Sequence, residues 1–286
     1  MAEKIRKQRL GEGALGVSLW KWQASEADEI YVTIFEKHQE LIHLFERFGF
    51  KLAGQNLRGE QVYLRSKKQI DYSDPFKSFP FICPKFEKAG MIPIEDGFHD
   101  SLFPYSELKG NKTEIEEETA GNGVLKVFIA SPISSLHYNI GEPVIIYRKY
   151  TGKDRPSFKS AATSFCTIAN LTLVKKSGKT VMSLEGFIKL AGNKTIFKEE
   201  GLRKLYHEKK NLILIEILYN GYFGKGHNVN YIRLKEAGLF EGYPYQIQYS
   251  PAEFIKILEM GDVCVQDVII DSSGTCGKYH ERTEAI

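Results

Sequence analysis

A proline- and phenylalanine-rich stretch, residues 71–123, divides the sequence into sections. It contains five prolines and six phenylalanines, and it ends in the acidic run Glu114-Ile115-Glu116-Glu117-Glu118. Prolines at this density interrupt helices and central strands, because proline lacks the backbone N–H and fixes φ. The phenylalanines are too apolar for a solvated linker. We therefore expect residues 71–123 to form a connector packed onto its neighbours, with an exposed loop at about residues 109–123.

Residues 1–70 have the pattern of a small unit of helices and strands. Apolar residues at helical spacing predict one helix after Gly11 and a second helix that Gly49 ends. β-Branched and aromatic residues predict a strand over residues 29–35. Two shorter strands are expected over residues 50–54 and 61–65, around a turn that contains Asn56 and Gly59. The predicted order is therefore helix, strand, helix, strand, strand.

The start of this unit resembles the GNAT family of acyltransferases. Gln8-Arg9-Leu10-Gly11-Glu12-Gly13 fits the family signature Q/R-x-x-G-x-G/A, and the strand and helix that follow agree in order and spacing. In such a site, glycines let backbone N–H groups approach a pyrophosphate at the N-terminus of a helix. The resemblance implies transfer of an acetyl group from acetyl-CoA to an amine. The residues that it implies for holding acetyl-CoA are Gln8, Gly11, Gly13, Ala14 and His38.

The chain departs from that family in three ways. Phe45 stands where the family usually has a tyrosine that protonates the leaving thiolate, and His38 stands where an asparagine commonly contacts the cofactor. An exposed histidine near a helix start is the simpler interpretation of His38. Only residues 4–66 match, which is the C-terminal half of the fold, so no catalytic residue is assigned. A half-sheet leaves an open strand edge, which we expect a second copy, a partner chain or the connector to cover, unless the chain is a shortened form of a longer protein.

Residues 124–271 are expected to form a small β-barrel with peripheral helices, which makes the whole chain an α+β protein. The predicted strands are residues 124–130, 143–150, 164–174, 212–219 and 263–270. Helices are predicted over residues 184–191 and 251–260, the second with Ser250 as its cap and Pro251 in its first turn. Residues 272–286 contain two glycines and few apolar side chains, so they are expected to form a loose tail.

Two segments of this section resemble PUA-like barrels, the group that contains ASCH and EVE domains. Ile140-Gly141-Glu142-Pro143-Val144-Ile145-Ile146-Tyr147-Arg148 resembles the "G-D-x-V-x-I-Y" strand of that group, and residues 162–168 resemble the strand after it. The resemblance implies that the protein binds RNA or a modified base, in a pocket lined by aromatic and polar side chains.

Residues 219–228 combine glycines, aromatic rings, a lysine and a histidine directly after an apolar strand. Glycines allow close approach of the backbone, rings can stack on a base, and a lysine can meet a phosphate. The candidate nucleic-acid-binding residues are Tyr219, Asn220, Phe223, Lys225 and His227, with Tyr147, Arg148 and Tyr150 as a facing wall. A glycine-rich turn packed by its own aromatics, and strand aromatics within the core, are the competing interpretations.

Composition and spacing exclude several other classes. The formal net charge is +3, and the excess of 22 Lys and Arg over 16 Asp and Glu in residues 126–286 is too small for a DNA-binding stripe. No segment approaches the roughly 18 consecutive apolar residues of a membrane helix. The four cysteines, Cys83, Cys166, Cys264 and Cys276, are far apart and form no C-x-x-C pair. This spacing favours reduced thiols in the cytoplasm, and we expect no metal site. His99 and Asp100 are adjacent, and sequence neighbours are not expected to face each other on a helix or strand.

Two functions are consistent with these patterns. In the first, a GNAT-related N-acetyltransferase is brought to RNA by a PUA-like domain. In the second, the protein is a non-enzymatic RNA- or modified-base-binding protein, and residues 1–70 are a structural remnant. The intact glycine-rich segment favours the first function, whereas Phe45 and the absent half of the fold favour the second.

Overall fold

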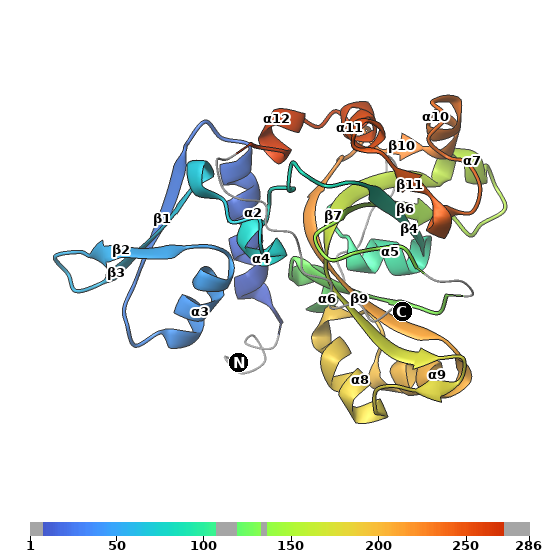
Figure 1. Cartoon of the computed structure of the whole chain (residues 1–286), viewed down its shortest axis with the longest axis horizontal. Helices are drawn as coiled ribbons and strands as arrows, with labels where there is room; N and C mark the ends of the chain where they lie inside the picture. Colours follow the sequence, from blue (N-terminus) through green and yellow to red (C-terminus); the bar gives the residue numbers. More distant parts are fainter. Residues whose placement is uncertain (1–7, 107–118, 133–135, 272–286) are drawn as a thin grey trace.

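The computed structural model describes residues 8–106, 119–132 and 136–271. Its strands form a three-stranded sheet in the order β1-β3-β2 and an eight-stranded sheet in the order β11-β4-β6-β7-β9-β5, with β8 and β10 paired to β7 (Figure 1). Helices pack on both sheets, so the predicted α+β class is confirmed. The predicted loop at residues 109–123 lies mostly, and the tail from residue 272 wholly, outside the described residues.

The small sheet follows the order of elements predicted for residues 1–70. Its strands are antiparallel, and β3 lies between β1 and β2. The edge of β1 that faces away from β3 pairs with no other described strand. The elements are α2 (Leu10–Gln23), β1 (Glu29–Ile34), α3 (Gln39–Arg47), β2 (Lys51–Gln55) and β3 (Gln61–Ser66), followed by η1 (Lys67–Gln69) and α4 (Pro75–Ser78).

The proline-rich stretch contributes a strand that the sequence did not predict. This strand, β4 (Ala89–Glu95), runs parallel to β6 and continues into α5 (Asp96–Leu102). Pro93 is tolerated because β11 pairs only with Ala89 and Gly90, which leaves the β11 side of Pro93 without a strand neighbour. A short helix, α6 (Thr119–Asn122), then leads into the large sheet.

The strands predicted for residues 124–219 are present, and β7 and β9 are longer than predicted. The large sheet contains β5 (Leu125–Ala130), β6 (Pro143–Lys149), β7 (Ala161–Lys176), β8 (Lys179–Thr180), β9 (Leu212–Tyr222), β10 (Val229–Asn230) and β11 (Gln248–Tyr249). Its helices are α7 (Pro156–Lys159), α8 (Leu184–Ala191), η2 (Gly192–Lys194), α9 (Glu199–Glu208), α10 (Tyr231–Glu236), η3 (Pro244–Gln246), α11 (Pro251–Met260) and α12 (Val265–Val268). The predicted helices α8 and α11 are confirmed, and Ser250 and Glu253 form a reciprocal capping box. Helices α9 and α10 were not predicted.

The strand predicted over residues 263–270 is wrong, because the chain forms the single helical turn α12 there. Val265 and Val268 are three residues apart, so one helical turn points both toward the core next to α11. The carbonyl of Val268 accepts a hydrogen bond from the backbone N–H of Ile82, at 2.9 Å. A run of β-branched residues therefore packs here as a turn rather than as a strand.

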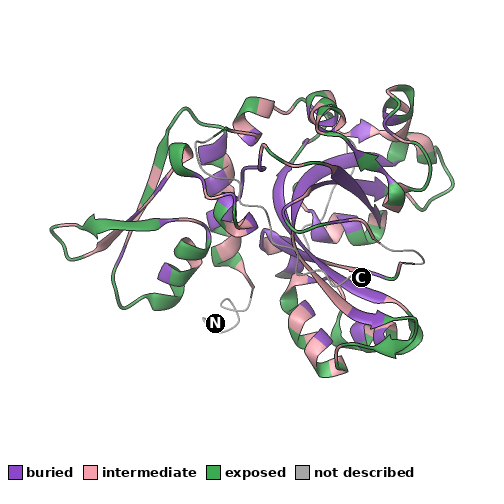
Figure 2. Ribbon diagram, viewed as in Figure 1, coloured by how far each residue is buried: buried purple, intermediate pink, exposed green. Residues whose placement is uncertain are grey.

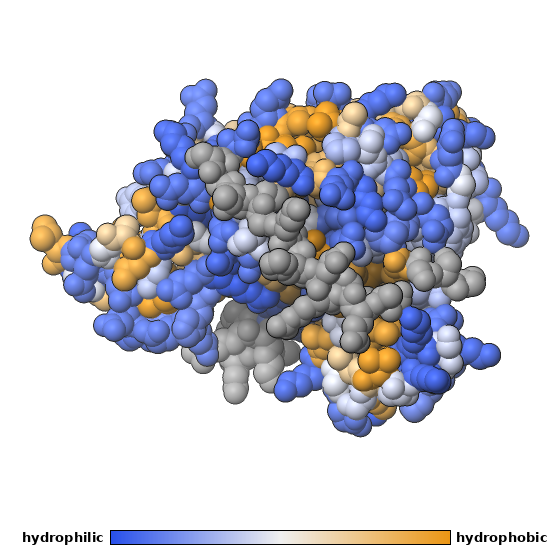
Figure 3. All heavy atoms as spheres, in the orientation of Figure 1, coloured by the Kyte–Doolittle hydropathy of each residue, from blue (hydrophilic) through white to orange (hydrophobic). Residues whose placement is uncertain are grey.

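Both faces of the central strands are buried, as the purple strands of Figure 2 show. In β6, Ile145 packs on the face covered by α11, whereas Ile146 packs on the face covered by α5. A continuous apolar run is typical of a strand that is covered on both sides. Most of the surface seen in Figure 3 is hydrophilic, with apolar atoms at the far end of the β2–β3 hairpin, where Leu57 is fully exposed.

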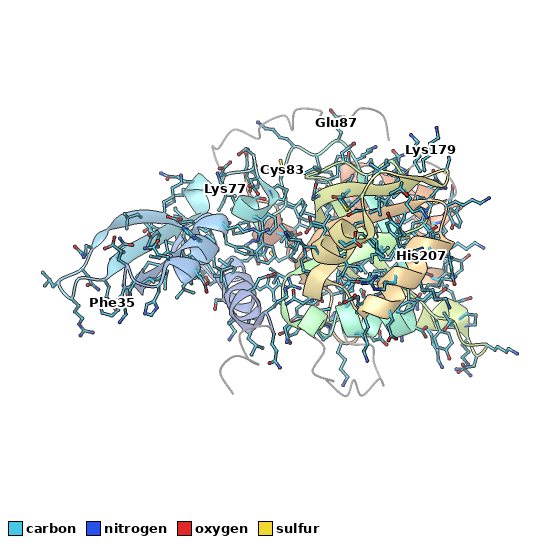
Figure 4. The ribbon with its side chains drawn as sticks, turned by 90° about the horizontal axis from the view of Figure 1, so that it is seen from below. Phe35, Lys77, Cys83, Glu87, Lys179 and His207 are labelled. Carbon is cyan, nitrogen blue, oxygen red and sulfur yellow. The ribbon has the colours of Figure 1, made fainter. Side chains whose placement is uncertain are left out.

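The small unit and the large sheet share one hydrophobic cluster, in which Leu15 and Leu19 of α2 pack with Leu125 and Leu218 of the large sheet. Figure 4 shows Lys77 and Cys83 at the junction of the two. Cys83 is disulfide-bonded, contrary to the prediction of reduced thiols, whereas Cys166 is a buried free thiol and Cys264 an exposed one.

Candidate functional site

The glycines of the predicted acetyl-CoA segment lie at the start of α2, and close packing accounts for one of them. A Cβ atom on Gly13 would lie 2.1 Å from the carbonyl oxygen of Asn122, and one on Gly16 would lie 2.1 Å from Cγ1 of Val124. These two glycines let α2 rest directly on the junction of α6 and β5. Gly11 has open space around its Cβ position.

Charged groups occupy the first turn of α2. The guanidinium of Arg9 donates to Glu12 at 2.7 Å and to the carbonyl oxygen of Leu125 at 2.5 Å. Glu12 accepts a hydrogen bond from the backbone N–H of Leu125 at 2.8 Å. The carboxylate at this helix start is therefore paired with a guanidinium and a backbone N–H, and these contacts leave the predicted pyrophosphate site untested.

The remaining residues of the predicted acetyl-CoA set are spread over two elements. The carbonyl of Gln8 accepts from the side-chain amide of Asn122 at 3.0 Å, and Ala14 is exposed. His38 is exposed at the start of α3, and its side chain makes no capping hydrogen bond. Phe45 packs edge-on against Phe50, with ring centroids 4.9 Å apart. Acetyl-CoA binding therefore stays a prediction without support from these contacts.

Of the predicted nucleic-acid-binding residues, three are packed in the core. Tyr147 packs on Phe240 with ring centroids 5.0 Å apart, and Phe223 packs on Phe165. Asn220 is fully buried and donates to the carbonyl oxygen of Pro80 at 3.0 Å. For these three side chains the structure agrees with the competing interpretation, in which the aromatics pack within the protein.

Three other predicted residues reach the surface. Lys225 is exposed in the turn after β9, and His227 in the same turn lies 3.2 Å from the carboxylate of Asp262. Gly224 and Gly226 have φ of +82° and +93°, so this turn needs their left-handed backbone. Tyr150, which is partly exposed, donates its hydroxyl proton to Asp154 at 2.5 Å.

The last two predicted residues, Tyr219 and Arg148, lie at the two ends of one buried hydrogen-bond chain. At the Tyr219 end, Ser106 Oγ lies 2.6 Å from the tyrosine hydroxyl and 2.5 Å from Ser164 Oγ. Ser164 is 3.1 Å from Thr163 Oγ1, which lies 2.7 Å from His99 Nε2. The chain joins β7, β9, α5 and the segment after α5.

At the other end, His99 contacts its own sequence neighbour. Its Nδ1 lies 2.8 Å from Asp100 Oδ1, so the expectation that adjacent residues do not face each other was wrong here. Asp100 also accepts two hydrogen bonds from Arg148, at 2.7 and 2.8 Å. A bidentate arginine–carboxylate pair of this kind is strong and fixes the geometry of both side chains.

The charge states of His99 and Asp100 determine which group donates in each hydrogen bond between Tyr219 and His99. Burial lowers the pKa of His99, against the opposing effect of Asp100, so the imidazole is neutral near pH 7. Burial by itself raises the pKa of Asp100, but the hydrogen bonds from Arg148 and His99 bring it well below its usual range. A neutral imidazole has one N–H group, and here it is at Nδ1, because the Asp100 carboxylate accepts a hydrogen bond there. His99 Nε2 must then accept a hydrogen bond from the Thr163 hydroxyl. It follows that Tyr219 donates to Ser106, Ser106 donates to Ser164, and Ser164 donates to Thr163.

Three aromatic side chains, Trp20, Tyr105 and Tyr222, pack together next to Tyr219, and we call them the aromatic cluster. Trp20 is 5.5 Å from the ring of Tyr105 and 5.7 Å from that of Tyr222, and the two tyrosine rings are 5.9 Å apart and nearly parallel. Tyr105 and Tyr222 are 42% and 40% exposed. Among the described residues, the indole N–H of Trp20 has no hydrogen-bond partner.

A buried lysine also lies close to the ring of Tyr219. Lys126 Nζ is 5.7 Å from the centre of the Tyr219 ring and donates to the carbonyl oxygens of Ala120 and Gly121. Burial lowers the pKa of Lys126 to about 7. The amine therefore changes its charge near neutral pH, close to the Tyr219 ring.

Sequence reasoning missed the aromatic cluster because its members come from three distant segments. Trp20 belongs to α2, Tyr105 to the segment after α5, and Tyr222 to the end of β9. The one available signal was Tyr222, which lies within the run 219–228. Within residues 8–106, 119–132 and 136–271, no group of three or more His, Cys, Asp or Glu side chains is placed to hold a metal ion. No helix of these segments is long and apolar enough to span a bilayer.

Comparisons with known proteins give distant structural neighbours only. A scan against family models matches none of them, and no curated protein matches significantly. Among solved structures, the chain is similar to the ASCH protein from Zymomonas mobilis, at 12% identity and a TM-score of 0.39, over 60% of this chain and 94% of that one.

Two mutant forms of the same Zymomonas mobilis protein also match. Both are 11% identical over 60% of this chain, with TM-scores of 0.39 and 0.36, and the matches cover 95% and 96% of those chains. These proteins carry the ASCH name of the group that residues 140–148 resemble, and nothing in the comparisons supports the acyltransferase resemblance. At TM-scores below 0.4, the likeness carries no conclusion about the activity of this chain.

Proposed function

We propose that this protein binds single-stranded RNA, with a base stacked on the aromatic cluster. The observation that supports the proposal is that three separate elements bring Trp20, Tyr105 and Tyr222 together at the surface. Two partly exposed tyrosines in contact with a tryptophan are an unusual use of apolar surface unless a ligand covers it. Aromatic rings of this kind bind unpaired bases by stacking.

The charged residues nearby in the sequence suit the same ligand. Lys225 follows Tyr222 by three residues and is exposed, so its ammonium group is free to meet a backbone phosphate. His227 lies in the same turn and pairs with Asp262 across its surface. In this proposal the aromatic cluster binds the base, and the turn after β9 binds the sugar-phosphate backbone of the RNA.

Fluorescence anisotropy with a labelled single-stranded RNA of about a dozen nucleotides tests the proposal. Stacking contributes about 1–3 kcal/mol per base, so Tyr222→Ala and Tyr105→Ala are each expected to raise the Kd by roughly 5- to 150-fold. Tyr31→Ala is the matched control, because Tyr31 is 69% exposed on β1, outside the cluster. An equal effect of all three substitutions, or no binding by the wild type, would contradict the proposal.

Tryptophan emission gives a second, independent measurement. The chain contains two tryptophans, and Trp22 is only 4% exposed. A base stacked on the aromatic cluster should quench the emission of Trp20, and Trp20→Phe should abolish the quenching while it leaves an aromatic ring in place. Quenching that persists in Trp20→Phe would place the RNA elsewhere.

A further inference from the structure

A second candidate ligand site lies away from the aromatic cluster, at the ends of the parallel strands β4 and β6. It is a cavity of about 310 Å³, bounded by β4, α5, β5, the segment after η2, and η3. This volume falls at the lower end of the range for small-molecule sites, about 300–1,000 Å³. The site accommodates one small molecule rather than a folded partner.

The walls of the cavity are mostly apolar, and two aromatic pairs belong to them. Phe98 and Phe197 form one pair of rings with centroids 5.4 Å apart, and Tyr243 and Tyr245 form a second pair with centroids 5.6 Å apart. Phe98 is 45% exposed and Tyr243 is 59% exposed. Tyr245 is held in place because its hydroxyl donates to the carbonyl oxygen of Pro93. Such walls favour a flat aromatic ring as the buried part of a ligand.

Two opposite charges line the same cavity. Glu95 and Lys149 are register partners at the ends of β4 and β6, and their charged atoms are 3.8 Å apart. Both side chains are more than half exposed, so the ion pair between them contributes little and is easily opened. Among the described lining residues, these are the two that carry a charge.

The geometry points to a zwitterion with an aromatic ring, in the manner of a free aromatic amino acid. The ring occupies the space between the two aromatic pairs, the ligand carboxylate meets Lys149, and the ligand ammonium meets Glu95. A purely anionic ligand would face the Glu95 carboxylate, and a purely cationic one would face the Lys149 ammonium. Only a ligand with both charges satisfies both side chains.

Calorimetric titration with three related probes tests this site. L-Phenylalanine carries both charges, phenethylamine only the positive one and 3-phenylpropionate only the negative one. L-Phenylalanine is expected to bind at least tenfold more tightly than either. Lys149→Gln should lower its affinity to that of phenethylamine, and Glu95→Gln should lower it to that of 3-phenylpropionate.

Control variants keep the test specific. Lys176→Gln removes an exposed lysine elsewhere on the surface, and Phe158→Ala removes a phenylalanine that is 61% exposed outside the cavity. Neither should change the affinity for L-phenylalanine, whereas Phe98→Ala should lower it, in a protein whose melting temperature confirms that it is folded. Equal affinity for the three probes, or no binding of L-phenylalanine at millimolar concentration, would overturn the inference. Tyr222→Ala should bind the amino acid as the wild type does, which separates this result from that of the RNA experiment.

Discussion

Gln23 of α2 and Asn220 of β9 donate their side-chain amides to the same acceptor, the carbonyl oxygen of Pro80, at 2.9 and 3.0 Å. All three residues are buried. The small unit, the proline-rich stretch and the large sheet are therefore tied together at one atom.

Truncating both donors should cost more than the sum of the two single truncations. After Gln23→Ala or Asn220→Ala, the carbonyl of Pro80 keeps one donor, so each single substitution is expected to cost about 1–2 kcal/mol. The double variant leaves that carbonyl buried without a partner, which adds about 1–3 kcal/mol. Urea unfolding of the four proteins in a double-mutant cycle measures the difference. Strict additivity would mean that the two bonds act independently.

Substitutions along the start of α2 should separate packing from cofactor binding. Gly13→Ala is expected to destabilise the protein by about 1–3 kcal/mol, because its Cβ would overlap the carbonyl of Asn122. Gly11→Ala is the matched control, and we expect it to stabilise the protein by about 0.5–1 kcal/mol, since its Cβ position is open. Thermal unfolding measures both changes.

A different substitution at Gly11 tests the acetyl-CoA hypothesis. If Gly11 lies against the pyrophosphate of acetyl-CoA, Gly11→Glu should abolish binding, because it adds a side chain and a negative charge at that point. Calorimetric titration of acetyl-CoA into both proteins gives the answer. A wild-type protein that does not bind acetyl-CoA, or a variant that binds it equally well, removes the cofactor hypothesis.

Removing the Thr163 hydroxyl should destabilise the protein, because it interrupts the hydrogen bonds that run from Tyr219 to His99. Thr163→Val keeps the shape of the side chain but removes the hydroxyl that donates to His99 Nε2, at an expected cost of about 1–3 kcal/mol.

In the wild type, the pKa of His99 lies below its unfolded value of 6.5, so the unfolded chain binds more protons as the pH falls below 6.5. The free energy of unfolding should therefore fall between pH 6.5 and pH 5.

A variant without the imidazole identifies the source of that fall. In His99→Gln, the loss of stability between pH 6.5 and pH 5 should be smaller, as measured by urea unfolding at several pH values. An unchanged pH profile would assign the loss to other histidines.

Lys126 should make the protein more stable as the pH rises above 7. Its pKa is lowered to about 7 in the folded chain from 10.5, so between these values the unfolded state holds more protons. The free energy of unfolding then increases with pH, by at most about 1.4 kcal/mol per unit. Cys166 opposes this above about pH 9, because burial raises the pKa of its thiol. Between pH 7 and pH 8.5, Lys126→Met should flatten the rise.

For RNA binding, Lys225→Ala should weaken affinity and also reduce the dependence on salt. One lost phosphate contact lowers the slope of log K against log salt by about 0.7 for a single strand. Lys235→Ala, which removes a lysine from α10, is the comparison. A reduced affinity with an unchanged salt slope would show that Lys225 does not contact a phosphate.

Local sequence signals predicted the local structure well. The order of elements in residues 1–70, the helix α8 and the N-cap at Ser250 each depend on residues within one or two turns of each other. The predicted strands between residues 124 and 219 are also present. In each case the spacing of apolar residues and the capping residue carry the information.

Features that depend on distant partners were not predictable in this way. Strand β4 exists because β6 pairs with it from beyond a long connection, and Pro93 argued against a strand there. The aromatic cluster joins Trp20, Tyr105 and Tyr222 only after the chain has folded. The contact between His99 and Asp100 depends on rotamers, which spacing along the sequence does not report.

Because α2 and the large sheet share one hydrophobic cluster, we expect the small unit and the large sheet to unfold together. Leu15 and Leu19 cover Leu125 and Leu218, so a fragment that lacks residues 1–70 would present those leucines to water. Calorimetry of the whole protein should record one transition, and a protease that cuts between α4 and β4 should release no stable piece. Evolution of either part is then constrained by the other, since an insertion that shifts α2 would also disturb the strands beneath it.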